Sequence, residues 1–434
     1  MVIVFGVLAL GVLVAGNWYL WRRLFRDTTQ GPGPARRTGA AVIAGGWLLA
    51  VGAVVTERAG APFWLQQVLA WPGFLWLALS VYLLLGVVAG EVVRPVLRRL
   101  PARRARATPA APQAQPVPAD RVPPKAPESG QTAGNGPESA RTAGTVREPA
   151  QTAESGPQSA PEPSRRLFVS RVVAGAAAAA AVGTVGYGTY GVLRGPRVKR
   201  VTVPLAKLPR AAHGYRIAVV SDIHLGPILG RDFAQKVVDT INSTQPDIVA
   251  VVGDLVDGSV KDLGPAAAPL SRLKAPSYFV TGNHEYFSGA EQWVEEVRRL
   301  GLLPLENART ELPWFDLAGV NDIAGESEGQ GPDFTKALGG RDTARACVLL
   351  AHQPVQIHDA VRHGVDLQLS GHTHGGQLWP GNFVAAAANP TVAGLERYGD
   401  TQLYVSRGAG AWGPPTRVGA PSDITVIELA SKQA

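Results

Sequence analysis

Four long apolar segments in the first half of the chain predict helices that cross a membrane. Residues 2–20, 38–55 and 68–90 each approach the roughly 20 residues that a helix needs to span a bilayer. The fourth segment is the milder, Ala- and Gly-rich run of residues 172–193. Buried helices of a soluble core are the alternative, but such helices normally carry a polar face. The sequence Trp71-Pro72-Gly73 predicts that the third helix begins only there.

Arginine clusters beside the first three segments predict their orientation. Five Arg lie between the first two segments, and six lie within residues 94–106, after the third. Because Lys and Arg collect on the cytoplasmic side of a membrane, the N-terminus and the connector of residues 57–62 are expected outside. No basic residue precedes the first apolar run, so a cleaved signal peptide is not expected.

Residues 101–164 predict a flexible, disordered linker, because they are rich in Pro, Ala, Gly, Ser, Thr and Gln and poor in large apolar residues. A segment that begins Ser164-Arg165-Arg166 then precedes the fourth apolar run and resembles a twin-arginine export signal. The alternative is an ordinary cytoplasmic flank of paired arginines. Both interpretations place the chain after this run outside, whereas the basic residues among 194–200 argue against that side.

From about residue 201 the pattern changes to short runs rich in Val, Ile and Leu, which predict strands buried on both faces. These runs are residues 216–220, 247–252, 277–280, 346–350 and 365–369. Helical patterns at residues 231–243 and 290–300 lie between them. This alternation predicts an α/β domain with much parallel sheet. The expected organisation is therefore a three-span region (1–100), a linker (101–164), a fourth span with the arginine pair (165–195) and a domain (201–434).

The formal net charge of +8 is unevenly divided along the 434 residues. Residues 1–200 hold 23 Lys and Arg against 9 Asp and Glu, whereas residues 201–434 hold 19 against 25. The basic residues of the first half flank membrane segments, so no nucleic-acid partner is expected. The lone Cys347 cannot form an intrachain disulfide, which excludes a disulfide-supported scaffold.

Polar residues of metal-binding types follow each predicted strand, where the carboxyl ends of parallel strands gather ligand-binding residues. In chain order they are Asp222-Ile223-His224, Gly253-Asp254-Leu255-Val256-Asp257, Gly282-Asn283-His284-Glu285, Ala351-His352 and Gly371-His372-Thr373-His374. Mixed nitrogen and oxygen donors without a thiolate suit divalent Mn, Fe, Zn or Co. Seven plausible ligands exceed one tetrahedral site and are enough for two metals. His213, His358 and His363 match no strand end and are expected to be surface or helix residues.

In this order the motifs resemble those of the calcineurin-like metallophosphoesterases. The longer string of residues 370–377 and the tail of residues 404–413 more specifically resemble the membrane-associated YkuE-like or YaeI-like branch. The resemblance covers about residues 201–434 and implies an α/β fold, a four-layer α-β-β-α sandwich with the metals at one sheet edge. It implies that Asp222, His224 and His374 hold one metal and that Asn283, His352 and His372 hold the other. Asp254 would bridge the two metals, and His284 would be the catalytic histidine.

This family resemblance implies a metal-dependent phosphoric ester hydrolase. Two metals can activate a bridging water, so that hydroxide attacks phosphorus in line, and His284 is free to protonate the leaving oxygen. Asp257, Glu285 and Thr373 are expected to orient ligands, or else to be structural. Arg407 is expected to contact a substrate phosphate, or else to form a surface salt bridge.

The sequence therefore predicts a membrane-anchored enzyme with its catalytic domain outside the cell membrane. Its substrate would be a phosphomonoester, phosphodiester or pyrophosphate, on a small molecule or on a lipid or envelope precursor. A non-catalytic sensor or scaffold that binds metal or phospholipid is the alternative.

Overall fold

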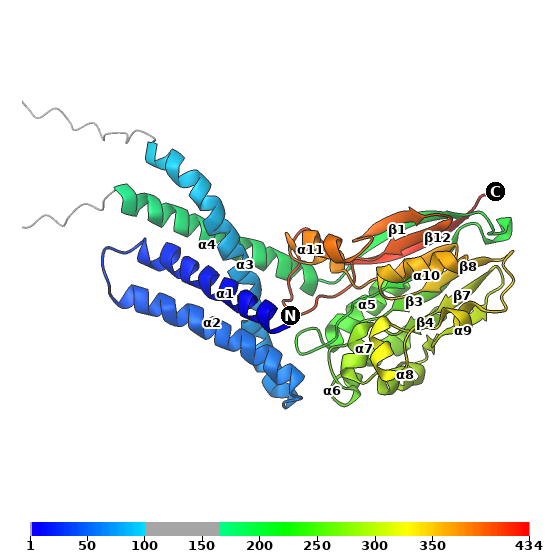
Figure 1. Ribbon diagram of the computed structural model, residues 1–434. Helices are drawn as coiled ribbons and strands as arrows, with labels where there is room; N and C mark the ends of the chain where they lie inside the picture. The colour runs from blue at the N-terminus through cyan, green and yellow to red at the C-terminus, as the bar shows by residue number, and fades with distance from the viewer. Residues whose placement is uncertain (1, 100–164, 434) are drawn as a thin grey trace, which may run out of the picture.

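The computed structural model describes residues 2–99 and 165–433, as a bundle of long helices joined to a two-sheet domain (Figure 1). The predicted linker at 101–164 lies outside the described residues. The bundle consists of α1 (Val2–Trp21), α2 (Pro34–Arg58), α3 (Phe63–Arg99) and α4 (Arg165–Leu193). Helices α2, α3 and α4 are long and apolar enough to cross a membrane. The four predicted apolar segments thus all form helices, and among the described residues α2, α3 and α4 are candidate membrane spans.

The prediction that the third helix begins at residues 71–73 was wrong. Helix α3 begins at Phe63, and Pro72 lies inside it. Gly73 packs so closely on α2 that a Cβ atom there would lie 2.5 Å from the Leu49 carbonyl oxygen. Proline is tolerated inside membrane helices where neighbouring helices support the chain, and this contact provides such support.

The domain after α4 contains two six-stranded sheets. In the first sheet the strand order is β1-β12-β2-β3-β4-β5, and in the second it is β10-β11-β9-β8-β7-β6. The strands are β1 (Arg197–Leu205), β2 (Tyr215–Val220), β3 (Ile248–Val252), β4 (Ser277–Val280), β5 (Leu303–Pro304), β6 (Ala308–Glu311), β7 (Phe315–Gly319), β8 (Ala346–Leu350), β9 (Leu367–Ser370), β10 (Gly394–Tyr398), β11 (Thr401–Val405) and β12 (Asp423–Ser431). All five predicted strands are present, and β2, β3 and β4 pair in parallel, as do β7, β8 and β9.

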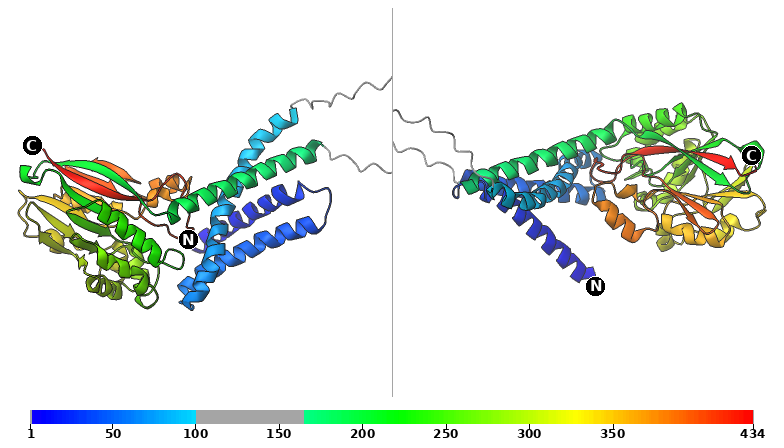
Figure 2. Two further views of the ribbon diagram at one scale, coloured as in Figure 1. Left: turned by 180° about the vertical axis from the view of Figure 1, so that it is seen from behind. Right: turned by 90° about the horizontal axis from the view of Figure 1, so that it is seen from above.

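Most helices of the domain lie on the outer faces of the two sheets, as Figure 2 shows from two further directions, whereas α11 buries no side chain. The helices are α5 (Arg231–Ser243), α6 (Val260–Ala267), α7 (Asn283–Ser288), α8 (Ala290–Arg299), α9 (Phe334–Leu338), α10 (Ile357–Arg362) and α11 (Gly381–Ala388). Helices α5, α6 and α8 pack on the first sheet, and α9 and α10 pack on the second. The predicted four-layer α-β-β-α sandwich is confirmed.

Alternating side chains of the central strands fill two apolar layers. In β2, Ile217 and Val219 face the second sheet, whereas Ala218 and Val220 face the helices. A strand whose two faces are both covered needs apolar residues at every position. This is why the predicted strands read as unbroken apolar runs, and why the first polar residues appear only where each strand ends.

Candidate metal centre

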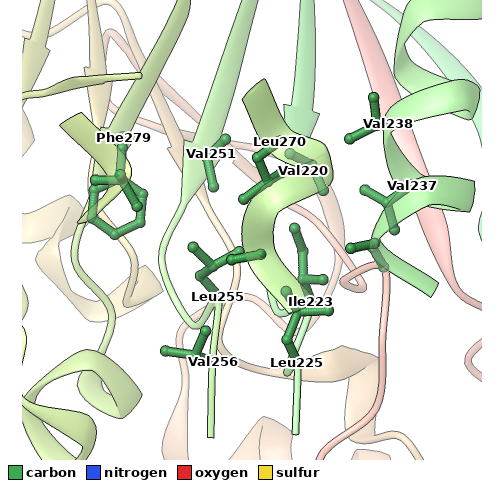
Figure 3. Packing of buried hydrophobic residues seen from close by; sticks show 14 of the residues in the cluster. Val220, Ile223, Leu225, Val237, Val238, Val251, Leu255, Val256, Leu270 and Phe279 are labelled. Atoms are coloured by element: carbon green, nitrogen blue, oxygen red, sulfur yellow. The ribbon is translucent and has the colours of Figure 1, made fainter. Parts of the chain in front are cut away.

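The predicted ligand motifs meet at one edge of the domain, because they follow the carboxyl ends of β2, β3, β4, β8 and β9. The first two motifs are held by apolar residues that lie between their polar ones. Ile223, Leu225, Leu255 and Val256 are buried in the cluster between the first sheet and its helices (Figure 3). Their burial leaves the intervening polar side chains on the other side of the loops.

Backbone hydrogen bonds join the first two loops side by side. The amide of Asp222 donates to the Gly253 carbonyl at 3.1 Å, and the amide of His224 donates to the Asp254 carbonyl at 3.1 Å. The two loops therefore extend the parallel pairing of β2 and β3 past the ends of the strands, which fixes the spacing of their carboxylate and imidazole groups.

A strained backbone marks the same residues. Among the described non-glycine residues, eight have positive φ, and five of these are predicted ligands. The five are Asp222, His224, Asp254, His372 and His374. Side chains rarely adopt this conformation, and where it persists it clusters at functional sites. The concentration at one sheet edge therefore supports a functional role for these loops.

The first group of ligands consists of Asp222, His224 and His374, all buried. The Nε2 atoms of His224 and His374 lie 3.0 Å apart, and His374 Nε2 lies 3.4 Å from Asp222 Oδ1. The second group consists of Asp254, His352 and His372. His352 Nε2 lies 3.1 Å from Asp254 Oδ2.

Asp254 and Asn283 complete this arrangement. Asp254 Oδ2 also lies 3.8 Å from His224 Nε2, so its carboxylate stands between the two groups. Asn283 Oδ1 lies 3.0 Å from Nδ1 of His372. The structure thus brings together all seven residues that the sequence predicted as metal ligands.

The residues fit two divalent cations in their chemistry as well as in their positions. The buried His352 Nε2 makes no hydrogen bond of good geometry although it lies 3.1 Å from Asp254 Oδ2, and a cation held between the two atoms would satisfy both. Burial alone would raise the pKa of Asp254, but the neighbouring His352 and His224 hold it well below its usual range. An ionised carboxylate among neutral imidazoles is a donor set that suits a metal of the Mn, Fe, Zn or Co type.

Asp257 accepts hydrogen bonds from two histidines at once. Its Oδ1 lies 2.7 Å from His284 Nδ1 and 2.9 Å from His224 Nδ1. Burial opposes a charge on His284, but the hydrogen bond and the negative charge of Asp257 raise the pKa of this histidine to about 9. Since Nδ1 of His284 is held by Asp257, Nε2 is the ring atom left for another partner.

Glu285 and Thr373 hold the loops. The fully buried Glu285 carboxylate accepts the amides of Gly282, Asp254 and Leu255 at 2.6, 2.9 and 2.7 Å. Burial, with the charge of Asp254, raises the pKa of Glu285 to about 7. Thr373 Oγ1 donates to the Val392 carbonyl at 2.6 Å and accepts the Gly375 amide. Both side chains therefore act on the backbone of the ligand loops.

The arginine at the centre is Arg417, which the sequence interpretation missed. Its buried guanidinium lies 3.0 Å from His374 Nδ1 and donates to the His374 carbonyl at 3.0 Å. Burial lowers the pKa of Arg417 to about 10. Arg407, the predicted phosphate contact, is half-buried with its aliphatic part beside Gly375. In the sequence, Arg417 is distinguished only as the single charged residue within Thr416–Ala420.

Comparison with known proteins agrees with this geometry. Residues 215–376 match the family described as calcineurin-like phosphoesterase. A transmembrane protein with a metallophosphoesterase domain from Danio rerio is 41% identical over 265 residues, which cover 57% of this chain and 60% of that protein. The chain thus spans less than two thirds of that relative.

Bacterial relatives are covered more completely. An uncharacterized metallophosphoesterase of Helicobacter pylori is 36% identical over 275 residues, which are 62% of this chain and 74% of that protein. The uncharacterized metallophosphoesterase YkuE of Bacillus subtilis is 28% identical over 284 residues, which are 62% of this chain and 98% of that protein. The ordered motifs, the sandwich and these relatives together show that the chain belongs to the calcineurin-like metallophosphoesterases, a family of metal-dependent phosphoric ester hydrolases.

Proposed function

We propose that this protein is a membrane-anchored phosphoesterase that uses two divalent metals and His284. The observation that carries the proposal is the position of Asp254 between two buried ligand groups, 3.1 Å from His352 and 3.8 Å from His224. Asp222, His224 and His374 would hold one ion, Asn283, His352 and His372 the other, and Asp254 both. Such ions supply Lewis-acid activation of water and neutralise the charge of a phosphate ester.

The residues around these groups supply the proton donor and hold the ligands in position. His284, held through Nδ1 by Asp257, donates the proton that the leaving oxygen of the ester requires. The same Asp257 carboxylate fixes the ring of His224, as partners of metal-binding histidines commonly do. Glu285 holds the amides around Asp254, so that the bridging carboxylate keeps its place between the groups.

The proposal predicts that Asp254→Ala abolishes hydrolysis. With Mn²⁺, the full-length protein is expected to hydrolyse p-nitrophenyl phosphate or bis-p-nitrophenyl phosphate. Loss of the shared carboxylate should lower kcat/KM by about 10³-fold or more, because both ligand groups lose a charge. His213→Ala is the matched control, since this histidine is exposed and precedes β2, at the end of the strand opposite the ligand loop. Undiminished turnover by Asp254→Ala, or none by the wild type, would instead favour the non-catalytic sensor or scaffold.

The charge distribution of the bundle supports an extracytoplasmic catalytic domain. The ends of α1 and α3 and the starts of α2 and α4 carry the arginine clusters and gather at the end of the bundle remote from the domain (Figure 1). By the positive-inside rule this end is cytoplasmic. Of the basic residues after α4, Arg197, Lys199 and Arg200 belong to β1, where Lys199 lies over the ring of Tyr404, and Arg194 precedes that strand. Use of Arg165 and Arg166 as a twin-arginine signal stays a prediction.

This orientation predicts that protease added to intact spheroplasts digests the domain of residues 201–434. Lysis of the spheroplasts should make no further difference to its digestion. A domain that is protected in intact spheroplasts and digested only after lysis would place it in the cytoplasm and contradict the proposed topology.

A further inference from the structure

The end of α2 and the first part of α3, on either side of the α2–α3 turn, lie against the metal centre. A cavity of about 20 Å³ is lined by His224 and Asp257 on one side and by Glu57 and Phe74 of the membrane helices on the other. This volume is close to that of one water molecule, so the helices cover this side of the centre tightly. Glu57 thereby lies beside His224 and Asp257, which follow it by more than 160 positions in the chain.

Several contacts hold the membrane helices in this position. Phe74 packs in one cluster with Ile228, which follows the His224 loop. The Tyr82 hydroxyl donates to the Trp379 carbonyl at 2.9 Å. The hydroxyls of Thr189 and Thr416 lie 2.7 Å apart in a buried hydrogen bond. The position of the helices is thus fixed by both apolar and polar contacts.

The rim beside His284 is aromatic and exposed. The rings of Phe287 and Trp412 each lie 5.5 Å from the His284 ring, between centroids. Phe287 is 75% exposed and Trp412 is 52% exposed. Large apolar groups clustered on a surface mark sites of interaction, and here they flank the predicted proton donor. Gly413, next to Trp412, lies beside Phe74 of α3, so the aromatic rim continues into the membrane helices.

We propose that the α2–α3 turn is a wall of the active site, and that this wall, with Phe287 and Trp412, makes the centre selective for phosphate esters that carry a long apolar chain. The inference rests on the proposed phosphoesterase function. Glu57 and Phe74 offer a phosphate no cation on the wall, so the phosphate binds at the ligand groups and the apolar chain binds at the aromatic rim. Hydrolysis adds the water oxygen to phosphorus and breaks the bond to the leaving oxygen, which takes up a proton.

Matched pairs of esters test this selectivity on the full-length protein in phosphatidylcholine nanodiscs with Mn²⁺. The diester pair is p-nitrophenyl hexadecyl phosphate and p-nitrophenyl methyl phosphate, and the monoester pair is hexadecyl phosphate and ethyl phosphate. The wild type should prefer the long-chain member of the pair that it hydrolyses, by about tenfold or more in kcat/KM. The double variant Phe287→Ala, Trp412→Ala should lower that ratio to near one.

Trp314→Ala is the control for this ratio, because Trp314 is another exposed tryptophan but precedes β7, at the end of the sheet opposite the ligand loops. It should leave the preference unchanged. A wild type that hydrolyses the long-chain and short-chain esters with nearly equal kcat/KM would overturn the inference. So would a double variant that keeps the wild-type preference for the long-chain ester. Either result would leave the phosphoesterase function intact. Hydrolysis of neither pair would overturn both.

A second arm tests the wall itself. Glu57→Trp fills the cavity and should lower kcat/KM for long and short esters by about tenfold or more. Arg58→Trp is the matched control, because the exposed Arg58 neighbours Glu57 but does not line the cavity. Manganese content measured on the purified variants should stay at the wild-type value, which separates a blocked site from an unfolded one. Wild-type kinetics in Glu57→Trp would exclude the turn as a wall.

Discussion

The helix bundle and the two-sheet domain sort apolar side chains in opposite ways. The domain buries large side chains such as Phe279 and Trp293 completely, whereas the least exposed side chains of the bundle are mostly small ones such as Ala50, Ala78 and Ala181. Many large apolar side chains of the bundle point outward, and Leu48 is 75% exposed. In water the hydrophobic effect favours burial of large apolar groups in the domain core. In lipid this effect is absent between helices, and small residues at the contacts allow close helix packing. The contrast indicates which surface faces lipid and which faces water.

The largest effect on stability is expected in the domain, from Ile223→Ala. This side chain is 1% exposed and anchors the loop that carries Asp222 and His224 (Figure 3). The truncation should lower the free energy of unfolding of the domain by about 2–4 kcal/mol, through lost transfer energy and the cavity left behind.

The control for this variant is Val238→Ala, in the same apolar cluster but on α5. Denaturation measures the stability of both variants, and titration with Mn²⁺ measures their metal affinity. Only Ile223→Ala should weaken metal binding. Equal metal affinities in the two variants would contradict the role of Ile223 as a loop anchor.

An intermediate effect is expected from Asp257→Asn, which keeps the size of the side chain but removes the charge that faces His284 and His224. Loss of a partner that orients metal-binding and catalytic histidines should lower kcat/KM by about 10- to 100-fold. Steady-state kinetics and the metal content of the purified variant check this. Asp262→Asn, at an exposed helix start on α6, is the control and should keep wild-type kinetics. Unchanged kinetics in Asp257→Asn would show that the shared hydrogen bond is dispensable.

The smallest effect is expected in the bundle, from Leu48→Ala. This change resembles Ile223→Ala chemically, but the side chain faces outward. In a lipid nanodisc it should alter stability by less than about 0.5 kcal/mol, because lipid surrounds the side chain whether or not the helices are packed. Thermal denaturation in nanodiscs measures the effect. A loss as large as that of Ile223→Ala would show that this face is buried in a protein contact.

The part of the site that could be predicted from sequence is the part carried by strand ends. Asp222, Asp254 and His352 each follow a run of Val, Ile, Leu or Ala, and parallel strands bring such ends to one edge. The apolar runs, each followed by a polar residue, therefore predicted that these ligands lie close together. The same reasoning could locate five strands, but not β1 and β12, whose parallel pairing joins residues near positions 197 and 423.

The remaining features depend on contacts that no local pattern encodes. Arg417 and Arg407 both lie in a Gly-rich tail without periodicity, so residue type alone could not show which of them reaches His374. Pro72 has the usual signature of a helix start, and the close contact of Gly73 with α2, which supports α3 through this proline, depends on tertiary packing. The contact of Glu57 with the centre is likewise set by packing between two parts of the molecule.

Arg417 also has a practical consequence for protein engineering. Its side chain holds His374, while its backbone amide donates to the Gly188 carbonyl of α4 at 3.4 Å. A Cβ atom at position 188 would lie 2.7 Å from the Arg417 carbonyl oxygen, so the helix and the loop meet without room for a side chain. A soluble fragment that begins after Leu193 lacks Gly188 and therefore loses the backbone contact that supports Arg417. Biochemical work on an isolated domain is therefore better served by a fragment that retains the last turns of α4, with its outward apolar residues replaced.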